Sequence, residues 1–177
     1  MVHDRTDSEP LRKSLRGFSL VELIIAIALM AILISAATMS FSTWQAKAKV
    51  DEQTRTILSD LNDARTRAFT QKRVSGIVFN PSSYVLKTYT SETEYSTATN
   101  AATKGTTVYT KTVRYGLTKA GASIANTPVI FDTSGFTNDW FTIFVDPTYS
   151  SASVNCIVIS AARVNMGKLN GTACEFK

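Results

Sequence analysis

Residues 16–22 read Arg-Gly-Phe-Ser-Leu-Val-Glu, and the apolar run that follows them, Leu23 to Ala46, contains no charged residue. As an α-helix, with about 1.5 Å of rise per residue, this run spans roughly 36 Å. The hydrocarbon core of a bilayer is about 30 Å thick. The stretch therefore predicts a helix that can cross a membrane, with one glycine and one acid just before it.

Glu22 stands at the start of the apolar run, where a charge is unusual. A carboxylate inside a bilayer costs roughly 2.5 to 3.5 kcal/mol on insertion scales and usually has a partner. Two interpretations are open from the residues alone. Either Glu22 pairs with a cation in the apolar environment, or it lies at the depth of the lipid headgroups and reaches water.

A short basic leader, a glycine, a phenylalanine, an acid and a long apolar run occur here in one order, which resembles the class III signal of type IV prepilins and type II secretion pseudopilins. The match lies at Gly17, Phe18, Leu20, Val21, Glu22 and Leu23. The resemblance implies that a prepilin peptidase cuts after Gly17 and that the new N-terminus, Phe18, is N-methylated. It also implies that Glu22, the fifth residue of the mature chain, docks each subunit into a filament.

The leader Met1 to Gly17 sets the expected orientation. Its basic side chains lie nearest the apolar run, and basic segments stay on the cytoplasmic side of the bacterial inner membrane. After a single membrane pass, the rest of the chain is expected in the periplasm and, after assembly, in a filament. An ordinary secretory signal differs, because its apolar part precedes the cleavage site and is removed.

The composition limits the exported part to one domain, since about 130 residues remain beyond the leader and the apolar run. The leader carries four basic and three acidic side chains, so its removal lowers the formal net charge from +5 to +4. This mild excess does not by itself indicate nucleic acid binding. The only histidine, His3, is in the leader, which leaves the mature chain without a Ser-His pair. We expect no catalytic residue, no cofactor and no metal: the protein is the substrate of an enzyme rather than an enzyme.

The helical pattern continues beyond the apolar run. Within 47–73, apolar residues recur at spacings of three, four and seven with charged residues between them, which is typical of an amphipathic helix. These apolar positions are Val50, Ile57, Leu58, Leu61, Ala64, Ala68 and Phe69. No proline or glycine interrupts 18–73. We therefore expect one helix from Phe18 to Arg73, with 18–46 in the membrane or in a filament core and 47–73 packed under a globular domain.

Residues 74–177 have the pattern of a β-rich periplasmic domain. Ser75–Asn80 and Tyr84–Tyr89 predict a hairpin, whereas residues 91–107 are rich in Ser, Thr, Ala and Asn and predict an exposed, mobile loop. Further short β-type runs are Val108–Leu117, Val129–Phe131, Trp140–Val145, Cys156–Ser160 and Arg163–Met166. A long helix followed by short strands predicts an α+β fold, in which an antiparallel sheet covers the apolar face of the helix. This architecture also resembles that of type IV pilins.

The order of the β-type runs is similar to that of the H-type minor pseudopilins of type II secretion and of the related FimT and FimU minor pilins. The runs read IVF at 77–79, YVL at 84–86, VIFDTSG at 129–135, IVIS at 157–160 and ARV at 162–164. The resemblance implies a structural subunit that primes or joins a periplasmic filament, for type II protein secretion or type IV pilus assembly. Its implied partners are the prepilin peptidase, other pilin or pseudopilin subunits, the inner-membrane assembly platform and membrane lipid.

DNA binding by a minor pilin of a competence pilus is the alternative function, with Arg163 and Lys168 as contacts. In FimT-like proteins a Gly-Arg-x-Arg element near the last strand pair is associated with DNA uptake. Residues 162–165 are Ala-Arg-Val-Asn here and lack the glycine and the second arginine. Losing an arginine removes a phosphate contact and its counterion release. The sequence therefore favours the structural role, with Arg163 as an ordinary surface residue.

The two cysteines, Cys156 and Cys174, lie on the predicted exported side, where thiols are normally oxidised. One interpretation is a disulfide that ties the tail 168–177 to the sheet and closes a loop of roughly nineteen residues, which stabilises the fold by about 3 kcal/mol. The other interpretation is a pair of reduced thiols, with Cys156 buried in the sheet and Cys174 in a frayed terminus.

Overall fold

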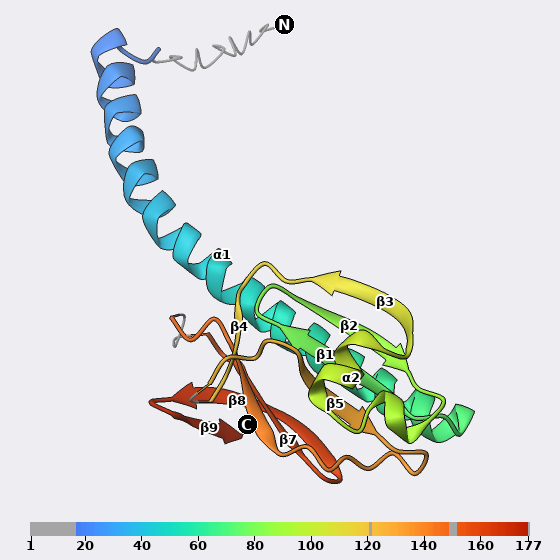
Figure 1. Cartoon of the computed structure of the whole chain (residues 1–177). Helices are drawn as coiled ribbons and strands as arrows, with labels where there is room; N and C mark the ends of the chain where they lie inside the picture. The colour runs from blue at the N-terminus through green and yellow to red at the C-terminus, as the bar shows by residue number, and fades with distance from the viewer. Residues whose placement is uncertain (1–16, 121, 149–151, 177) are drawn as a thin grey trace, which may run out of the picture. The chain divides into compact units, whose positions relative to one another are not determined.

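The computed structural model describes residues 17–120, 122–148 and 152–176, without the side chains of 36–40 (Figure 1). Of the expected leader, only Gly17 is among these residues, so the orientation inferred from Met1 to Arg16 lies outside them. The chain divides into two compact units, Met1–Phe41 and Ser42–Lys177.

One helix, α1 (Leu20–Gln71), contributes residues to both units. Its 52 residues confirm the prediction of a single long helix, and the lack of proline and glycine within it explains its length. The sequence also predicts that the first half of this helix crosses a bilayer. Within the described ranges, no helix combines the length and the apolar character that a membrane crossing requires.

In the second unit, α1 buries a stripe of apolar residues. Val50, Ile57, Leu61, Ala64 and Ala68 are fully buried, at the spacings of seven, four and three that place side chains on one helix face. Of the two other expected members of this stripe, Leu58 is half-buried and packs against the core, whereas Phe69 is 54% exposed. The prediction for Phe69 is wrong, because its ring does not pack in the core. The Lys72 amine lies over this ring in a cation–π contact, 4.3 Å from the ring centroid.

The first sheet has four antiparallel strands in the order β3-β2-β1-β5. Their bounds are β1 Ser75–Asn80, β2 Ser83–Thr88, β3 Thr106–Thr112 and β5 Thr127–Phe131. β1 and β2 form the predicted hairpin, in which Asn80 lies opposite Ser83. β5 pairs with the other side of β1 and is one edge of the sheet.

The second sheet has five antiparallel strands in the order β4-β6-β7-β8-β9. Their bounds are β4 Leu117–Lys119, β6 Phe141–Val145, β7 Cys156–Ser160, β8 Arg163–Asn170 and β9 Ala173–Phe176. The prediction of one strand at Val108–Leu117 is wrong, because this run is divided between β3 and β4, which belong to different sheets. Strand β9 is an addition that the sequence analysis did not predict.

The apolar faces of both sheets pack with the buried stripe of α1 in one core. The first sheet contributes Ile77, Phe79, Leu86, Val129 and Phe131, and the second contributes Ile143, Val145, Ile157 and Ile159. Each fully buried aliphatic or aromatic side chain contributes about 1.5 to 3 kcal/mol to folding. This packing of a long helix against antiparallel sheets confirms the predicted α+β fold.

Residues 91–107, expected to form a mobile loop, contain a 3₁₀ helix, η1 (Glu92–Glu94), and a short helix, α2 (Ala98–Thr103). The order comes from contacts that composition does not reveal. The buried Lys87 amine donates to the carbonyl oxygens of Ala102, at 2.6 Å, and Lys104, at 2.8 Å. The Tyr89 hydroxyl donates to Ala101 O at 2.9 Å. These bonds satisfy carbonyl groups at the C-terminal end of α2, where a cation is also favourable.

Candidate functional site

The segment that carries the expected cleavage site precedes α1. Gly17 and Phe18 lie outside the helix and are exposed, and the side chain of Phe18 is 82% exposed. A Cβ atom added to Gly17 would have no heavy atom within 4 Å. The chain itself thus sets no steric requirement for glycine at position 17, and any such requirement comes from a molecule that acts on it.

Glu22 is the acidic residue in the first turn of α1. This turn is closed by the Leu23 amide, which donates to Ser19 O at 3.1 Å. A carboxylate in the first turn is favourable because the helix dipole places a partial positive charge there. Glu22 is exposed, so its carboxylate is accessible to a cation from another molecule.

The first half of α1 exposes apolar side chains on every side. Leu20, Val21, Leu23, Ile24, Ile25, Ile27, Leu29, Met30, Ile32, Leu33 and Ile34 are all between 52% and 73% exposed. A helix that is apolar all round is stable only inside an apolar environment, such as a lipid bilayer or a bundle of helices. This half of α1 therefore has the surface of a helix that is buried in a core or in a membrane.

The second half of α1 is fixed to the β-rich part by polar side chains that the sequence did not single out. Gln53 receives hydrogen bonds from the amides of Arg114 and Tyr115 and donates to Tyr115 O at 2.7 Å. Asp51 accepts from the Val154 amide at 2.9 Å. Both side chains lie next to the apolar stripe, where the sequence pattern is that of ordinary surface residues. Their role becomes visible only from their hydrogen-bond partners in distant loops.

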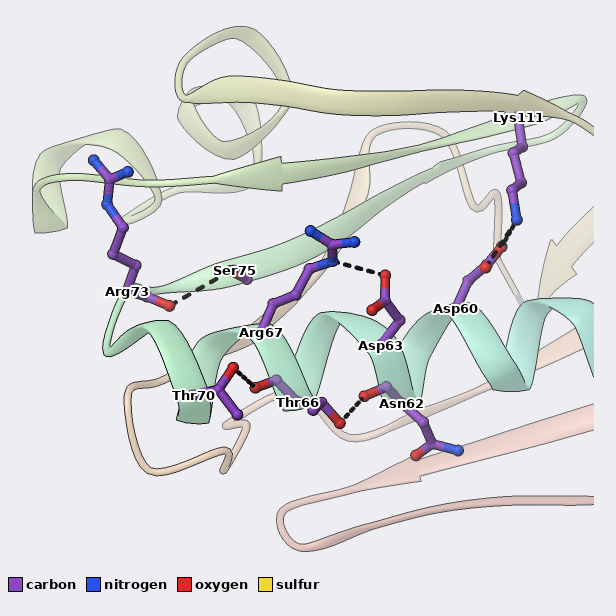
Figure 2. Close-up of polar contacts among 9 residues, drawn as sticks. All are labelled: Asp60, Asn62, Asp63, Thr66, Arg67, Thr70, Arg73, Ser75 and Lys111. Atoms are coloured by element: carbon purple, nitrogen blue, oxygen red, sulfur yellow. Dashed lines mark hydrogen bonds and ion pairs between the residues drawn. The ribbon is translucent and has the colours of Figure 1, made fainter.

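An ion pair joins α1 to the first sheet (Figure 2). The Lys111 amine of β3 donates to both carboxylate oxygens of Asp60 at 2.8 Å. The buried Tyr84 hydroxyl of β2 donates to the same carboxylate at 2.5 Å. Burial, followed by the hydrogen bond to Asp60, raises the pKa of Tyr84. The neighbouring pair of Arg67 and Asp63 lies within the helix, with Nε and Oδ2 at 2.8 Å.

Cys156 and Cys174 form a disulfide between β7 and β9, as the oxidised interpretation predicts, with a Cα–Cα distance of 6.0 Å. β8 lies between these two strands. At its Gly167, an added Cβ atom would lie 2.2 Å from Glu175 O and 3.0 Å from the Cys174 sulfur. Glycine at position 167 thus allows β9 to approach closely enough for the disulfide to form across β8.

The two residues considered for DNA contact both lie on β8 and are exposed. Arg163 and Lys168 are five positions apart. Because side chains alternate between the faces of a strand, an odd separation places these two on opposite faces. The structure therefore does not bring them together as one phosphate-binding surface. Among the described residues, no three His, Cys, Asp or Glu side chains are grouped in a way that could hold a metal ion.

Residues 12–38 match the family model for the prokaryotic N-terminal methylation motif. The match includes Gly17, Phe18 and Glu22. No curated protein and no solved structure matches the chain. The motif supports a type IV pilin-like protein. Pilin-like proteins are structural subunits rather than enzymes, and the motif implies processing by prepilin peptidase and interaction with other pilin subunits.

Proposed function

We propose that this chain is a minor pilin or pseudopilin of the H-type, a structural subunit that primes or joins a periplasmic filament for type II secretion or type IV pilus assembly. The observation that supports this proposal best is the first half of α1, whose exposed apolar surface begins within the methylation motif. The same helix then enters a packed α+β domain. Such a chain presents one surface for assembly and one independent domain.

In the proposed mechanism, prepilin peptidase cuts between Gly17 and Phe18 and the new α-amino group of Phe18 is methylated. An α-amino group has a pKa near 8 and is mostly protonated at neutral pH. In the filament, this cation pairs with Glu22 of a neighbouring subunit inside the apolar core. A buried ion pair adds little net stability, but an unpaired partner is costly. The pair therefore fixes the axial register between neighbours.

Before assembly, the helix anchors the subunit in the bacterial inner membrane, with 1–17 as the leader and 18–46 as the part held in lipid or in the filament core. Residues 47–73 and the domain 74–177 lie in the periplasm. An assembly platform in the inner membrane extracts the subunit from lipid. This arrangement gives the apolar surface of α1 a partner at each stage.

Assembly is tested with the variant Glu22→Gln, which keeps the size of the side chain and removes its charge. The amount of variant subunit in sheared filaments should fall at least about tenfold, because breaking a buried ion pair costs roughly 3 to 5 kcal/mol. Cleavage after Gly17 should continue. The matched control is Glu52→Gln on the same helix, since Glu52 forms an exposed ion pair with Lys49. Normal incorporation of the Glu22 variant would falsify the pairing mechanism.

Deletion of the gene separates the two proposed machines. Loss of protein secretion with retained surface pili assigns the subunit to type II secretion. Loss of pili with retained secretion assigns it to a type IV pilus. In either case, re-expression of the Glu52→Gln control should restore the phenotype and re-expression of Glu22→Gln should not.

A further inference from the structure

A groove of about 730 Å³ lies beside the edge strand β5. Its walls are the η1–α2 segment, of which α2 packs against β5 (Figure 1), and the connection 132–140 between β5 and β6. This volume is within the range of about 300 to 1,000 Å³ that is usual for small-ligand sites. All its lining residues belong to the second unit.

Aromatic rings line this groove and face solvent. Trp140 is 73% exposed and Phe136 is 53% exposed, and both come from the stretch Phe-Thr-Asn-Asp-Trp-Phe at 136–141. Tyr95 and Phe141 are half-buried in the same groove. Single exposed aromatic residues are ordinary, but a cluster of them on one hollow surface usually marks a binding site.

Polar side chains that line the same groove keep free hydrogen-bonding capacity. Asp139 Oδ2 accepts from the Ile130 amide at 2.8 Å and from the Thr137 hydroxyl at 3.2 Å. Asp132 Oδ1 accepts from the amides of Ser134, at 2.8 Å, and Phe136, at 3.0 Å. Within the described residues, the second oxygen of each carboxylate has no such hydrogen bond. The side-chain amides of Asn126 and Asn138, which also line the groove, have none there either.

The edge of β5 is not suited to a peptide strand. Pro128 has no amide hydrogen to donate, and the outward Ile130 amide is already bound by Asp139. Strands protected in this way resist pairing with another chain. A basic peptide side chain is also disfavoured, because the Lys119 amine already lies 4.5 Å from the centroid of the Phe141 ring within the groove.

We propose that this groove binds a neutral oligosaccharide. A pyranose ring presents an apolar C–H face that packs on an exposed aromatic ring, here Trp140, and a rim of hydroxyl groups. Carboxylate oxygens accept hydrogen bonds from hydroxyls, and amides both donate and accept. Asp132, Asp139 and Asn138 supply these groups in the groove that Trp140 lines. The inference depends on the β-rich domain alone, and it holds whichever filament the chain joins.

Tryptophan fluorescence tests the proposal, because Trp44 and Trp140 are the two tryptophans of the chain. In the full chain carrying Trp44→Phe, emission reports on Trp140. The protein is kept in a detergent without a sugar headgroup, and hexasaccharides of glucose, galactose and N-acetylglucosamine are titrated separately. At least one should produce a saturable change in emission. Hexalysine serves as the probe for a basic peptide.

Variants then locate the binding site by calorimetry. Trp140→Ala should weaken binding at least about tenfold, since a central aromatic anchor carries much of the affinity of a small site. Asn138→Ala should weaken it less, and the matched control Phe176→Ala, an exposed aromatic elsewhere, should have no effect. Trp140→Ala and Phe176→Ala should both keep the melting temperature of the parent, because both side chains are exposed. The proposal is overturned if no hexasaccharide binds, if hexalysine binds instead, or if binding survives Trp140→Ala unchanged.

Discussion

The two halves of α1 share one helical backbone but differ in what surrounds them. Leu33 in the first half is 70% exposed, whereas Leu61 in the second half is fully buried. The first half has apolar residues on every side, and the second alternates apolar with charged residues. The amphipathic half buries its apolar stripe against the sheets of its own chain, whereas a helix that is apolar all round is typical of a buried or membrane-embedded segment.

This difference separates assembly from folding. Changes in the first half should alter what the protein joins without altering the stability of the domain. Changes in the second half should alter the stability of the domain.

The largest effect is expected at Gly17. Gly17→Val should abolish cleavage, since we propose that the peptidase requires glycine there, while the domain melts at the parent temperature because no atom lies within 4 Å of the added Cβ. Mass spectrometry of the N-terminus checks for methylated Phe18. A normally processed, methylated product from this variant contradicts the proposed cleavage site.

Leucine truncation in the two halves compares them directly. Leu61→Ala should lower the free energy of unfolding by about 2 to 5 kcal/mol, because it leaves a cavity in the core. Leu33→Ala should leave that free energy unchanged and reduce recovery in sheared filaments. Urea unfolding followed by circular dichroism of the full chain in detergent measures the first quantity. Equal destabilisation by both variants would remove the distinction between the halves.

The disulfide should matter for the domain but not for maturation. Cys174→Ser should cost about 3 kcal/mol of unfolding free energy, the value expected for closing a loop of this length. Amide hydrogen exchange should increase in 168–176, with α1 still protected. The double variant with Cys156→Ser should behave like the single one. Stoichiometric thiol labelling of the denatured parent without reductant would show that no disulfide had formed in the cell.

The smallest effect concerns pH. Because the pKa of Tyr84 is raised in the folded domain by burial and by its hydrogen bond to Asp60, the folded state keeps this proton at pH values where the unfolded chain loses it. This contribution to stability is complete below the ordinary tyrosine pKa of about 10 and is lost as the pH rises above it. Melting temperatures measured across this range should fall less steeply in Tyr84→Phe than in the parent.

The elements that the sequence predicts correctly are those whose signal is local. The uninterrupted helix follows from the absence of proline and glycine, and the β1–β2 hairpin follows from two short β-type runs on either side of Pro81. The errors have non-local causes. Helix α2 depends on hydrogen bonds from Lys87, in β2, and from Tyr89, which follows β2, and a composition rich in Ser and Thr does not reveal them.

The candidate sites differ in the same way between local and non-local signals. The stretch 17–22 is contiguous, so the candidate assembly site is readable from the sequence alone, whereas its role stays a prediction. The break between β3 and β4 depends on Gln53, about sixty residues upstream of the loop that it binds. The groove beside β5 is assembled from four separate parts of the chain, namely Val74, residues 92–98, Lys119 and residues within 125–141, and no local pattern identifies it.

The order in which the strands enter the two sheets makes them mechanically interdependent. The chain builds β1, β2 and β3 in the first sheet, leaves for β4 in the second, returns for β5, and leaves again for β6. Neither sheet is a continuous stretch of chain, because β4 and β5 each follow a strand of the other sheet. A force applied at either end should therefore meet one cooperative barrier rather than two, which suits a subunit that is pulled from one environment into another.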